Sequence, residues 1–468
     1  MASELVTVKS QVVAHLKSWL QDCNKHHGDG CQVVPIAERS PHHIPDWVID
    51  TEDACIVRGC SVPRYVALSY TWSTPLYIDP EPPAVGPQLM LLKDNIDDFC
   101  AKGFLRTGIL DQAPVAVKDA IDLVQLSGIR YLWVDCLCIV QYDDTTSDRI
   151  GLMNEIYSGA YLTIIAAAGF ARGAIQVNAL QYNTEDKHSA ASQHANLLVS
   201  YWASRGWKFQ EQLLSIRAMI FLDNVYFWDC QREVNCPGSV TAAGTASQTA
   251  IRQDSGPQSG QYSLVKLQGM DMENSQRREW LPPVPDLKLY TELVCRYSDR
   301  NLTYDQDTLP AFYGVVETLA QSGFLGGFIC GLPALLLDSA LPWQPATKAR
   351  QRSVRESAAR LAPKAPLPSW SWVGCLLCDL VEGVGSRYDK RDFPSCTVEK
   401  LVDWSTFSNG RPINKPGLEQ VYKSTWGPHK SEDLPPQWSY QPTYIEPVTS
   451  KSYLGSFVHK AMPRGFYR

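Results

Sequence analysis

Two acidic side chains stand in stretches of sequence that are otherwise apolar. Asp135 lies inside "YLWVDCLCIV", and Glu211 lies inside "SRGWKFQEQLLS". A buried carboxylate without partners is costly, so each acid needs hydrogen-bond donors or a chemical role. Such a pair could act as general acid and base, or could bind ribose hydroxyls and stabilise a developing positive charge. The alternative for Asp135 is structural, in which it accepts backbone N–H groups or pairs with an arginine such as Arg205.

Further polar and aromatic side chains accompany the two acids and form our candidate substrate-binding set. Its members are Tyr70, Trp72, Gln141, Arg205, Trp207 and Gln210. Ligands of an open α/β sheet bind outside the carboxyl ends of its strands. Since these residues follow predicted strands or begin a predicted helix, we expect them to meet at that edge. Their aromatic faces suit a planar base or a nicotinamide ring.

Alternating strands and helices must position this set. "YVALSYTW", "YLWVDCLCIV" and "YLTIIAAA" have the apolar, β-rich character of buried strands. "DQAPVAVKDAIDLVQLSG" and "DRIGLMNEIYSGA" have helical periodicity, with Asp111 as the expected N-cap of the first helix and Gly128 at its end. "RAMIFLD" and "VYFWDC" are two further strands. The order predicts an open, mostly parallel α/β sheet with helices on both faces.

Four regions follow from these patterns. Residues 1–64 are expected to form an N-terminal helix and an irregular extension, and residues 65–235 the α/β domain. Residues 236–280 are rich in Ser, Gly and Gln, which is typical of a linker. Residues 281–468 are expected to be helical and then β-rich, with Trp370 and Trp372 alternating in a strand of this mixed α+β region.

Composition excludes several functional classes. The 468 residues carry a net charge of −6 and no long basic run, which argues against a nucleic-acid partner. The N-terminus lacks the features of a secretory signal, and the most apolar stretch is too short and too rich in glycine to span a membrane. We therefore expect a soluble cytoplasmic protein without a cofactor. Its partner would be a small molecule or a nucleotide, and self-association into a homo-oligomer stays open.

Fourteen cysteines are scattered along the chain, and we expect most to be reduced, buried thiols. Cys23, His26, His27 and Cys31 are closely spaced, but zinc needs four nitrogen or sulfur ligands, and this spacing is not a strong zinc signature. We expect loop thiols and imidazoles with no metal. A structural metal at Cys23, His26 and Cys31 is the alternative.

Four blocks together resemble a known family. "YVALSYTW", "LWVDCLCIVQYDD", "IYSGAYLTIIAAA" and "SRGWKFQEQLLSIR", in this order and spacing, are similar to the fungal heterokaryon-incompatibility (HET) domain. The resemblance implies a role in non-self recognition and programmed cell death in filamentous fungi. It also implies a flavodoxin-like fold similar to the TIR domain. Some TIR domains cleave NAD with a helix-borne glutamate, and Glu211 is the matching position, with Asp135 beside it.

Three functions remain open on this basis. The first is hydrolysis of a nucleotide such as NAD, with Glu211 and Asp135 as catalytic residues. The second is a cofactor-independent enzyme of fungal secondary metabolism that uses the same acids for acid–base catalysis, since HET-like proteins are also encoded among such genes. The third is a recognition module without catalysis, in which both acids are structural.

Overall fold

The structure is a computed structural model of the 468-residue chain. It describes residues 2–71, 89–143, 151–167, 193, 196–222, 225–237, 287–321, 324, 327–340, 344–345, 350–352, 367–376, 381–382, 406–408, 411–413, 438–443 and 454–459. The chain divides into two compact units. The first comprises residues 1–280, 300–315 and 355–362, and the second comprises residues 281–299, 316–354 and 363–468.

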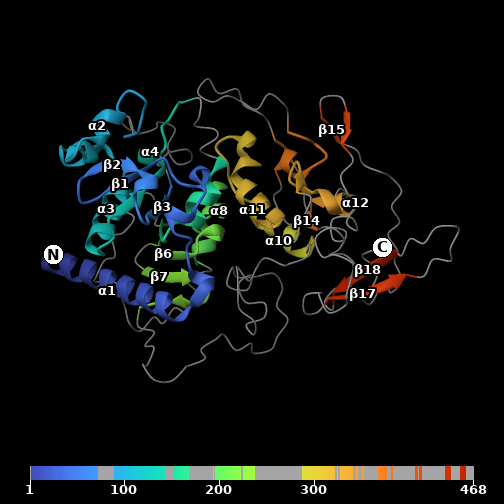
Figure 1. The fold of residues 1–468 in the computed structure, drawn as a ribbon, viewed down its shortest axis with the longest axis horizontal. Coiled ribbons are helices and arrows are strands. Elements are labelled where there is room, and N and C mark those ends of the chain that lie inside the picture. The colour runs from blue at the N-terminus through green and yellow to red at the C-terminus, as the bar shows by residue number, and fades with distance from the viewer. Residues whose placement is uncertain are drawn as a thin grey trace. The chain divides into compact units, whose positions relative to one another are not determined.

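A mixed sheet forms the centre of the first unit, and eight strands of the described residues build it in the order β2-β1-β4-β3-β5-β6-β7-β8 (Figure 1). The strands are β1 Trp47–Asp50, β2 Cys55–Arg58, β3 Val66–Tyr70, β4 Tyr131–Trp133, β5 Leu162–Ala166, β6 Arg217–Leu222, β7 Val225–Cys230 and β8 Val234–Asn235. The four inner strands, β4, β3, β5 and β6, run parallel to one another, and on each side the two outer strands are joined by antiparallel pairing. The prediction of an α/β sheet is therefore confirmed, and the sheet is mixed where we expected it to be mostly parallel.

Strand β3 is the position in the sheet on whose two sides the next two strands of the chain are added. The strand that follows it, β4, pairs on one side of β3, and the next strand, β5, pairs on the other. Such a reversal leaves a crevice at the carboxyl ends of the strands. Ser69 and Tyr70 end β3 at this position, so the topology itself marks this edge for the candidate site.

Helices lie on both faces of the sheet, as the alternation of side chains along β5 shows. Ile164 packs in the core cluster that also contains residues of α1 (Ala2–His26) and α3 (Val115–Leu126). Its neighbour Ile165 packs in a second cluster on the opposite face, because successive side chains of a strand alternate. On the same face as Ile165, Thr163 accepts a hydrogen bond from Ser215, the residue directly after α8 (Trp207–Leu214). The helix α6 (Met153–Gly159) packs against α8.

Three local predictions in this unit were wrong. The segment 47–58 was expected to be irregular, yet its apolar residues form β1 and β2 and extend the sheet. The run "YLWVDCLCIV" is not one strand, because β4 ends at Trp133 and a short helix, α4 (Asp135–Cys138), follows. Asp111 lies in a short 3-10 turn, and Pro114, with its fixed φ, directly precedes α3 instead. Gly128 does end α3, with a positive φ of 75°.

The second unit contains the helix α10 (Leu287–Ser298), the end of α11 (Pro310–Gln321) and α12 (Leu337–Ala340). Its strands pair two by two: β9 Phe328–Ile329 with β10 Leu332–Pro333, β11 Gln344–Pro345 with β14 Val381–Glu382, β12 Arg350–Gln351 with β13 Cys375–Leu376, β15 Thr406–Ser408 with β16 Arg411–Ile413, and β17 Trp438–Thr443 with β18 Leu454–His459. In these described residues α10 and α11 come first, and α12 lies between strands β10 and β11.

Trp370 and Trp372 do not alternate in a strand. Trp372 begins a 3-10 turn and is buried, and its indole N–H donates to the hydroxyl of Tyr290 at 2.9 Å, whereas Trp370 is 46% exposed. The predicted linker at 236–280 lies outside the described residues after its first two positions. None of the described helices combines the length and the apolar character that a membrane crossing requires.

Candidate functional site

A buried polar network surrounds Glu211 on α8. The side chain of Glu211 is 1% exposed, and Lys208, one helical turn earlier, donates to both carboxylate oxygens at 2.9 and 2.8 Å. From the end of β3, the hydroxyl of Ser69 donates to Oε2 at 2.6 Å. The indole N–H of Trp202 donates to the same hydroxyl at 3.0 Å. Both oxygens of Glu211 are therefore occupied by donors from the protein.

The environment of Glu211 changes its acidity. Burial raises the pKa of Glu211, because a low-dielectric surrounding disfavours the charged form. The ammonium of Lys208 and the hydroxyl of Ser69 act in the opposite direction, and the negative charge of Asp135 adds to the rise. Since the net pKa is raised, the network holds a carboxyl group that keeps its proton more readily than an exposed glutamate does.

Asp135 lies at the same edge of the sheet, at the start of α4. It is half-buried, and its Oδ1 accepts the N–H of Cys136 at 2.8 Å. The buried Tyr70 lies beside it: burial raises the pKa of the Tyr70 hydroxyl well above its ordinary value, and the charge of Asp135 raises it further. The amide of Gln141 donates to the backbone oxygen of Asp135 at 3.1 Å. The structure therefore brings Tyr70, Asp135, Gln141 and Glu211 to the carboxyl ends of β3 and β4.

Other predicted site residues point elsewhere. Arg205 donates to the hydroxyl of Thr303 at 2.5 Å, and Oε1 of Gln210 accepts the backbone N–H of Gly314 at 3.3 Å. Both side chains thus bind the segment 301–314 rather than the acids. Trp207 is half-buried and packs against the main core cluster. Trp72 lies outside the described residues.

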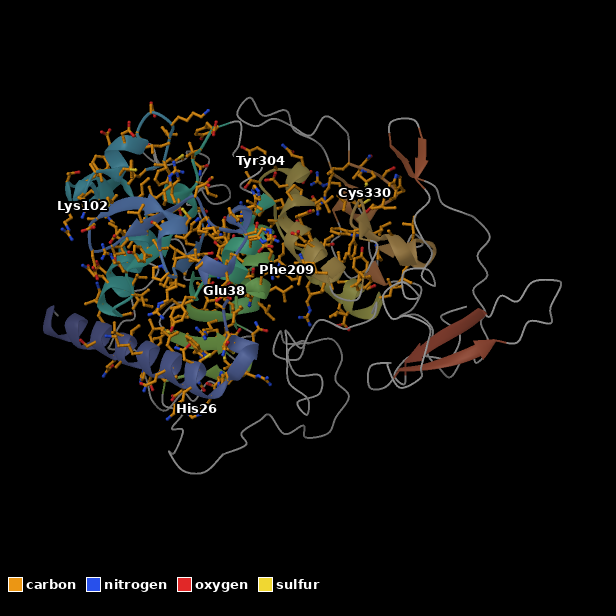
Figure 2. All side chains as sticks on the ribbon, viewed as in Figure 1. His26, Glu38, Lys102, Phe209, Tyr304 and Cys330 are labelled. Carbon is orange, nitrogen blue, oxygen red and sulfur yellow. The ribbon has the colours of Figure 1, made fainter. Side chains whose placement is uncertain are left out.

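The helix α8 is held by this same segment of the chain. The ring of Phe209, labelled in Figure 2, stacks on Phe312 with centroids 5.9 Å apart, and the guanidinium of Arg300 lies 4.8 Å from its centroid. A Cβ atom at Gly206 would lie 2.4 Å from the Cδ2 atom of Leu302, so a larger residue there would require Leu302 to shift. The position of Glu211 therefore depends on contacts between α8 and residues 300–314, a segment about 90 residues further along the chain.

Sequence reasoning missed Ser69, Lys208 and Trp202. A lysine three residues before an acid on a helix is a recognisable ion-pair spacing, so Lys208 could have been predicted. Ser69 is a polar residue in an apolar strand, which is a weaker signal. Nothing in the sequence connects Trp202 with Ser69, because only the fold brings the turn that precedes α8 next to β3.

Comparison with known families decides what kind of domain this is. Residues 65–211 match the family model of the heterokaryon incompatibility protein (HET). The chain contains a HET domain. The matched region begins at Tyr65, next to β3, and ends on Glu211, so it includes Ser69, Asp135 and Lys208. No curated protein and no solved structure matches the chain. The similarity to TIR domains and the catalytic roles of Asp135 and Glu211 therefore stay predictions.

Proposed function

We propose that this HET domain acts as a recognition module in a heterokaryon-incompatibility response of a filamentous fungus, in the cytoplasm, and that Glu211 stabilises the domain without touching a substrate. One observation carries this proposal: the carboxylate of Glu211 is 1% exposed and binds Lys208 and Ser69 through both oxygens. A catalytic acid must reach its substrate within hydrogen-bond distance. A buried and fully hydrogen-bonded ion pair is instead what a structural role requires.

A specific observation favours a second candidate, hydrolysis of the nicotinamide–ribose bond of a nucleotide such as NAD. Asp135 is half-buried and lies at the edge of the sheet where the strand order reverses around β3. It is close enough to Glu211, whose pKa is raised, to contribute to that rise. Here Asp135 would contact the ribose and the developing positive charge, while water would supply the oxygen that replaces nicotinamide. Glu211 would act through its charge and position in this case.

One experiment separates the two functions. Wild type, Asp135→Asn and the exposed-acid control Asp111→Asn are each expressed in a filamentous fungus, and growth arrest is scored. Each purified protein is incubated with NAD, and nicotinamide is measured. A recognition module predicts no turnover and the same growth arrest for all three proteins. Turnover by wild type that Asp135→Asn abolishes, together with the growth arrest, contradicts our proposal and establishes the second candidate.

Glu211→Gln then tests the structural role directly. We expect this variant to lose thermal stability, and we expect its biological effect to fall only in proportion to the fraction that is folded. If the variant is as stable as wild type and yet inactive in cells, Glu211 has a role beyond the fold.

A further inference from the structure

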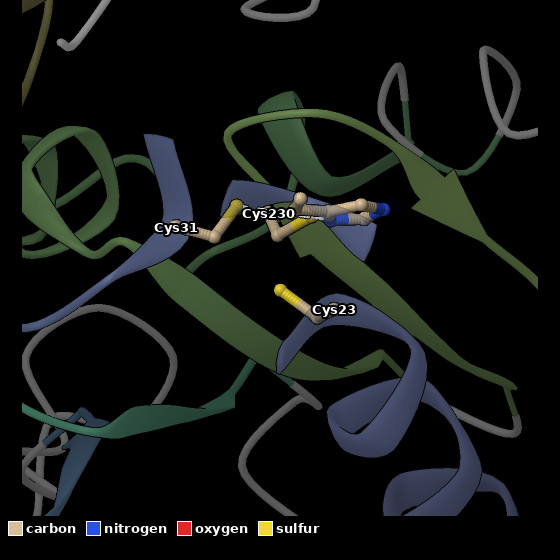
Figure 3. A group of neighbouring side chains, drawn as sticks. Cys23, Cys31 and Cys230 are labelled. Carbon is tan, nitrogen blue, oxygen red and sulfur yellow. Dashed lines mark hydrogen bonds between the residues drawn. The ribbon is translucent and has the colours of Figure 1, made fainter. Parts of the chain in front are cut away.

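Three cysteines and one histidine that take no part in the Glu211 network converge at the end of α1. They are Cys23 near the end of α1, His27 just after it, Cys31 at the end of a 3-10 turn (Gly28–Cys31), and Cys230 at the end of β7. Their four ligand atoms all lie within 4.8 Å of one another. Figure 3 shows the sulfur atoms of Cys23, Cys31 and Cys230 directed toward a common centre.

The distances agree with tetrahedral coordination. Nδ1 of His27 lies 3.4 Å from the sulfur of Cys230 and 3.8 Å from that of Cys31. A zinc ion with Zn–S bonds of about 2.3 Å and a Zn–N bond of about 2.1 Å places its ligands about 3.6–3.8 Å apart along the edges of a tetrahedron. Cys₃His is one of the ligand sets that structural zinc uses. The three sulfur atoms are buried, so solvent does not take a ligand position from that side.

The carboxylate of Glu233 orients the histidine. With Nδ1 directed at the sulfurs, Nε2 of His27 lies 3.5 Å from a carboxylate oxygen of Glu233. The same oxygen accepts a hydrogen bond from the amide of Asn235 at 2.7 Å. A carboxylate behind the second ring nitrogen of a metal-bound histidine fixes its tautomer, and this arrangement recurs in zinc proteins. It is an independent feature, because it lies outside the four ligands.

Charge at the cluster also fits a divalent cation. Three thiolates, a neutral imidazole and Zn²⁺ leave a net charge of about −1, which a nearby cation can offset. Arg217 is 3% exposed, and its positive charge interacts electrostatically with Cys23. Its Nη2 donates to Oδ1 of Asn24, the residue after Cys23, at 2.8 Å. The buried arginine therefore stands where the remaining negative charge would be.

We propose that Cys23, His27, Cys31 and Cys230 bind a structural zinc ion that fastens the end of α1 to strand β7 of the HET-domain sheet. Three ligands come from residues 23–31 and the fourth from position 230, so the metal closes a loop of about 200 residues. Earlier along the helix, His15 is hydrogen-bonded to Tyr226 at 2.7 Å, and Trp19 lies 6.5 Å from Trp228. The metal would therefore add a further link between α1 and β7 to these side-chain contacts.

Metal content tests the proposal on the full-length protein. Wild type is expressed with zinc in the medium, purified under reducing conditions, and its metals are quantified by mass spectrometry. We expect about one zinc per chain, and Co²⁺ exchanged into the protein should give the absorption of a tetrahedral thiolate site. Wild type that holds no zinc and takes up Co²⁺ without such absorption overturns the proposal. A disulfide between two of the four positions in the fresh protein overturns it as well.

Variants assign the metal to these ligands. Cys230→Ser and Cys31→Ser should each lose most of the bound zinc and the Co²⁺ charge-transfer band. Cys55→Ser replaces a buried cysteine outside the cluster and should keep both. Because a ligand variant could fail to fold, Glu233→Gln provides a milder test. Competition with a chelator should show that this variant binds zinc about 10–100-fold more weakly than wild type does. Zinc retained in full by both ligand variants contradicts this assignment.

Discussion

The carboxylate of Glu211 faces hydrogen-bond donors, whereas the sulfur atoms of Cys23, Cys31 and Cys230 face one another. Around Glu211, the ammonium of Lys208 supplies a positive charge, and both this ammonium and the hydroxyl of Ser69 donate hydrogen bonds to the carboxylate. At the cysteine cluster, the converging atoms are all electron-pair donors of the kind that a metal binds. The first cluster is therefore complete as a protein structure, whereas the second is one that, on our proposal, a cation completes.

The largest expected effect comes from removing the cation. Chelation of wild type under reducing conditions should lower its free energy of unfolding by more than any substitution below, since structural zinc contributes about 10 kcal/mol or more of apparent binding energy in zinc-finger peptides. Denaturant unfolding with and without chelator measures this effect. Cys230→Ser, which lacks a ligand, should no longer respond to the chelator. An equal response of both proteins would show that the comparison is wrong.

The next largest effect should follow from opening the Glu211 network. Lys208→Met leaves a carboxylate buried without its counter-ion and should cost about 3–5 kcal/mol in denaturant unfolding. The double variant Lys208→Met/Glu211→Met should cost less than the single one, because it removes both charges. Lys102→Met breaks the exposed pair with Asp53 and should change stability far less. Equal losses for the two lysines would contradict a buried ion pair.

A smaller effect is expected from Ser69→Ala. The substitution removes one donor to Glu211 and the acceptor of the Trp202 indole N–H, so it should cost about 1–3 kcal/mol. Urea unfolding followed by tryptophan fluorescence suits the measurement, because Trp202 is adjacent. Ser61→Ala removes an exposed hydroxyl that is bonded to the backbone of Arg58 and serves as the control. A loss no larger than that of the control would argue that the network contributes nothing to stability.

The smallest expected effect is a dependence on pH. Burial raises the pKa of Glu211, so the unfolded chain releases this proton at a lower pH than the folded domain. The folded state should therefore lose stability as the pH rises from the ordinary glutamate value of about 4.3 through the raised value. Glu211→Gln does not titrate, so its stability relative to wild type should improve over this window. A constant difference between the two proteins would exclude a raised pKa.

The cysteine cluster shows how far sequence reasoning reached. The spacing of Cys23, His26 and Cys31 prompted the alternative of a metal, although we expected none, and the structure places His27 rather than the exposed His26 beside the sulfur atoms. Cys230 carries no local signal, because it is an apolar-looking position at the end of a strand. Only the packing of α1 against β7 brings it within reach. The fourth ligand therefore could not have been predicted from spacing.

The sequence predicted the fold more completely than it predicted the site. The apolar runs at β3, β5, β6 and β7 and the periodic helix α3 have strong local patterns, and the structure confirms them. The sequence failed at Asp135, where we expected a strand and the chain turns into α4. There, the backbone carbonyl of Val134 accepts the N–H groups of Leu137 and Cys138. The side chain of Asp135 accepts the N–H of Cys136, and such a local bond competes with sheet pairing.

Residue types and periodicity within short segments were enough to give the HET-domain resemblance and the α/β class, and to single out Glu211 as a candidate. Only the folded chain shows that Ser69, Lys208 and Trp202 enclose Glu211, and that Cys230 joins Cys23, His27 and Cys31. Burial and the direction of a side chain depend on what packs against it. Those neighbours come from strands and helices that are distant in the chain.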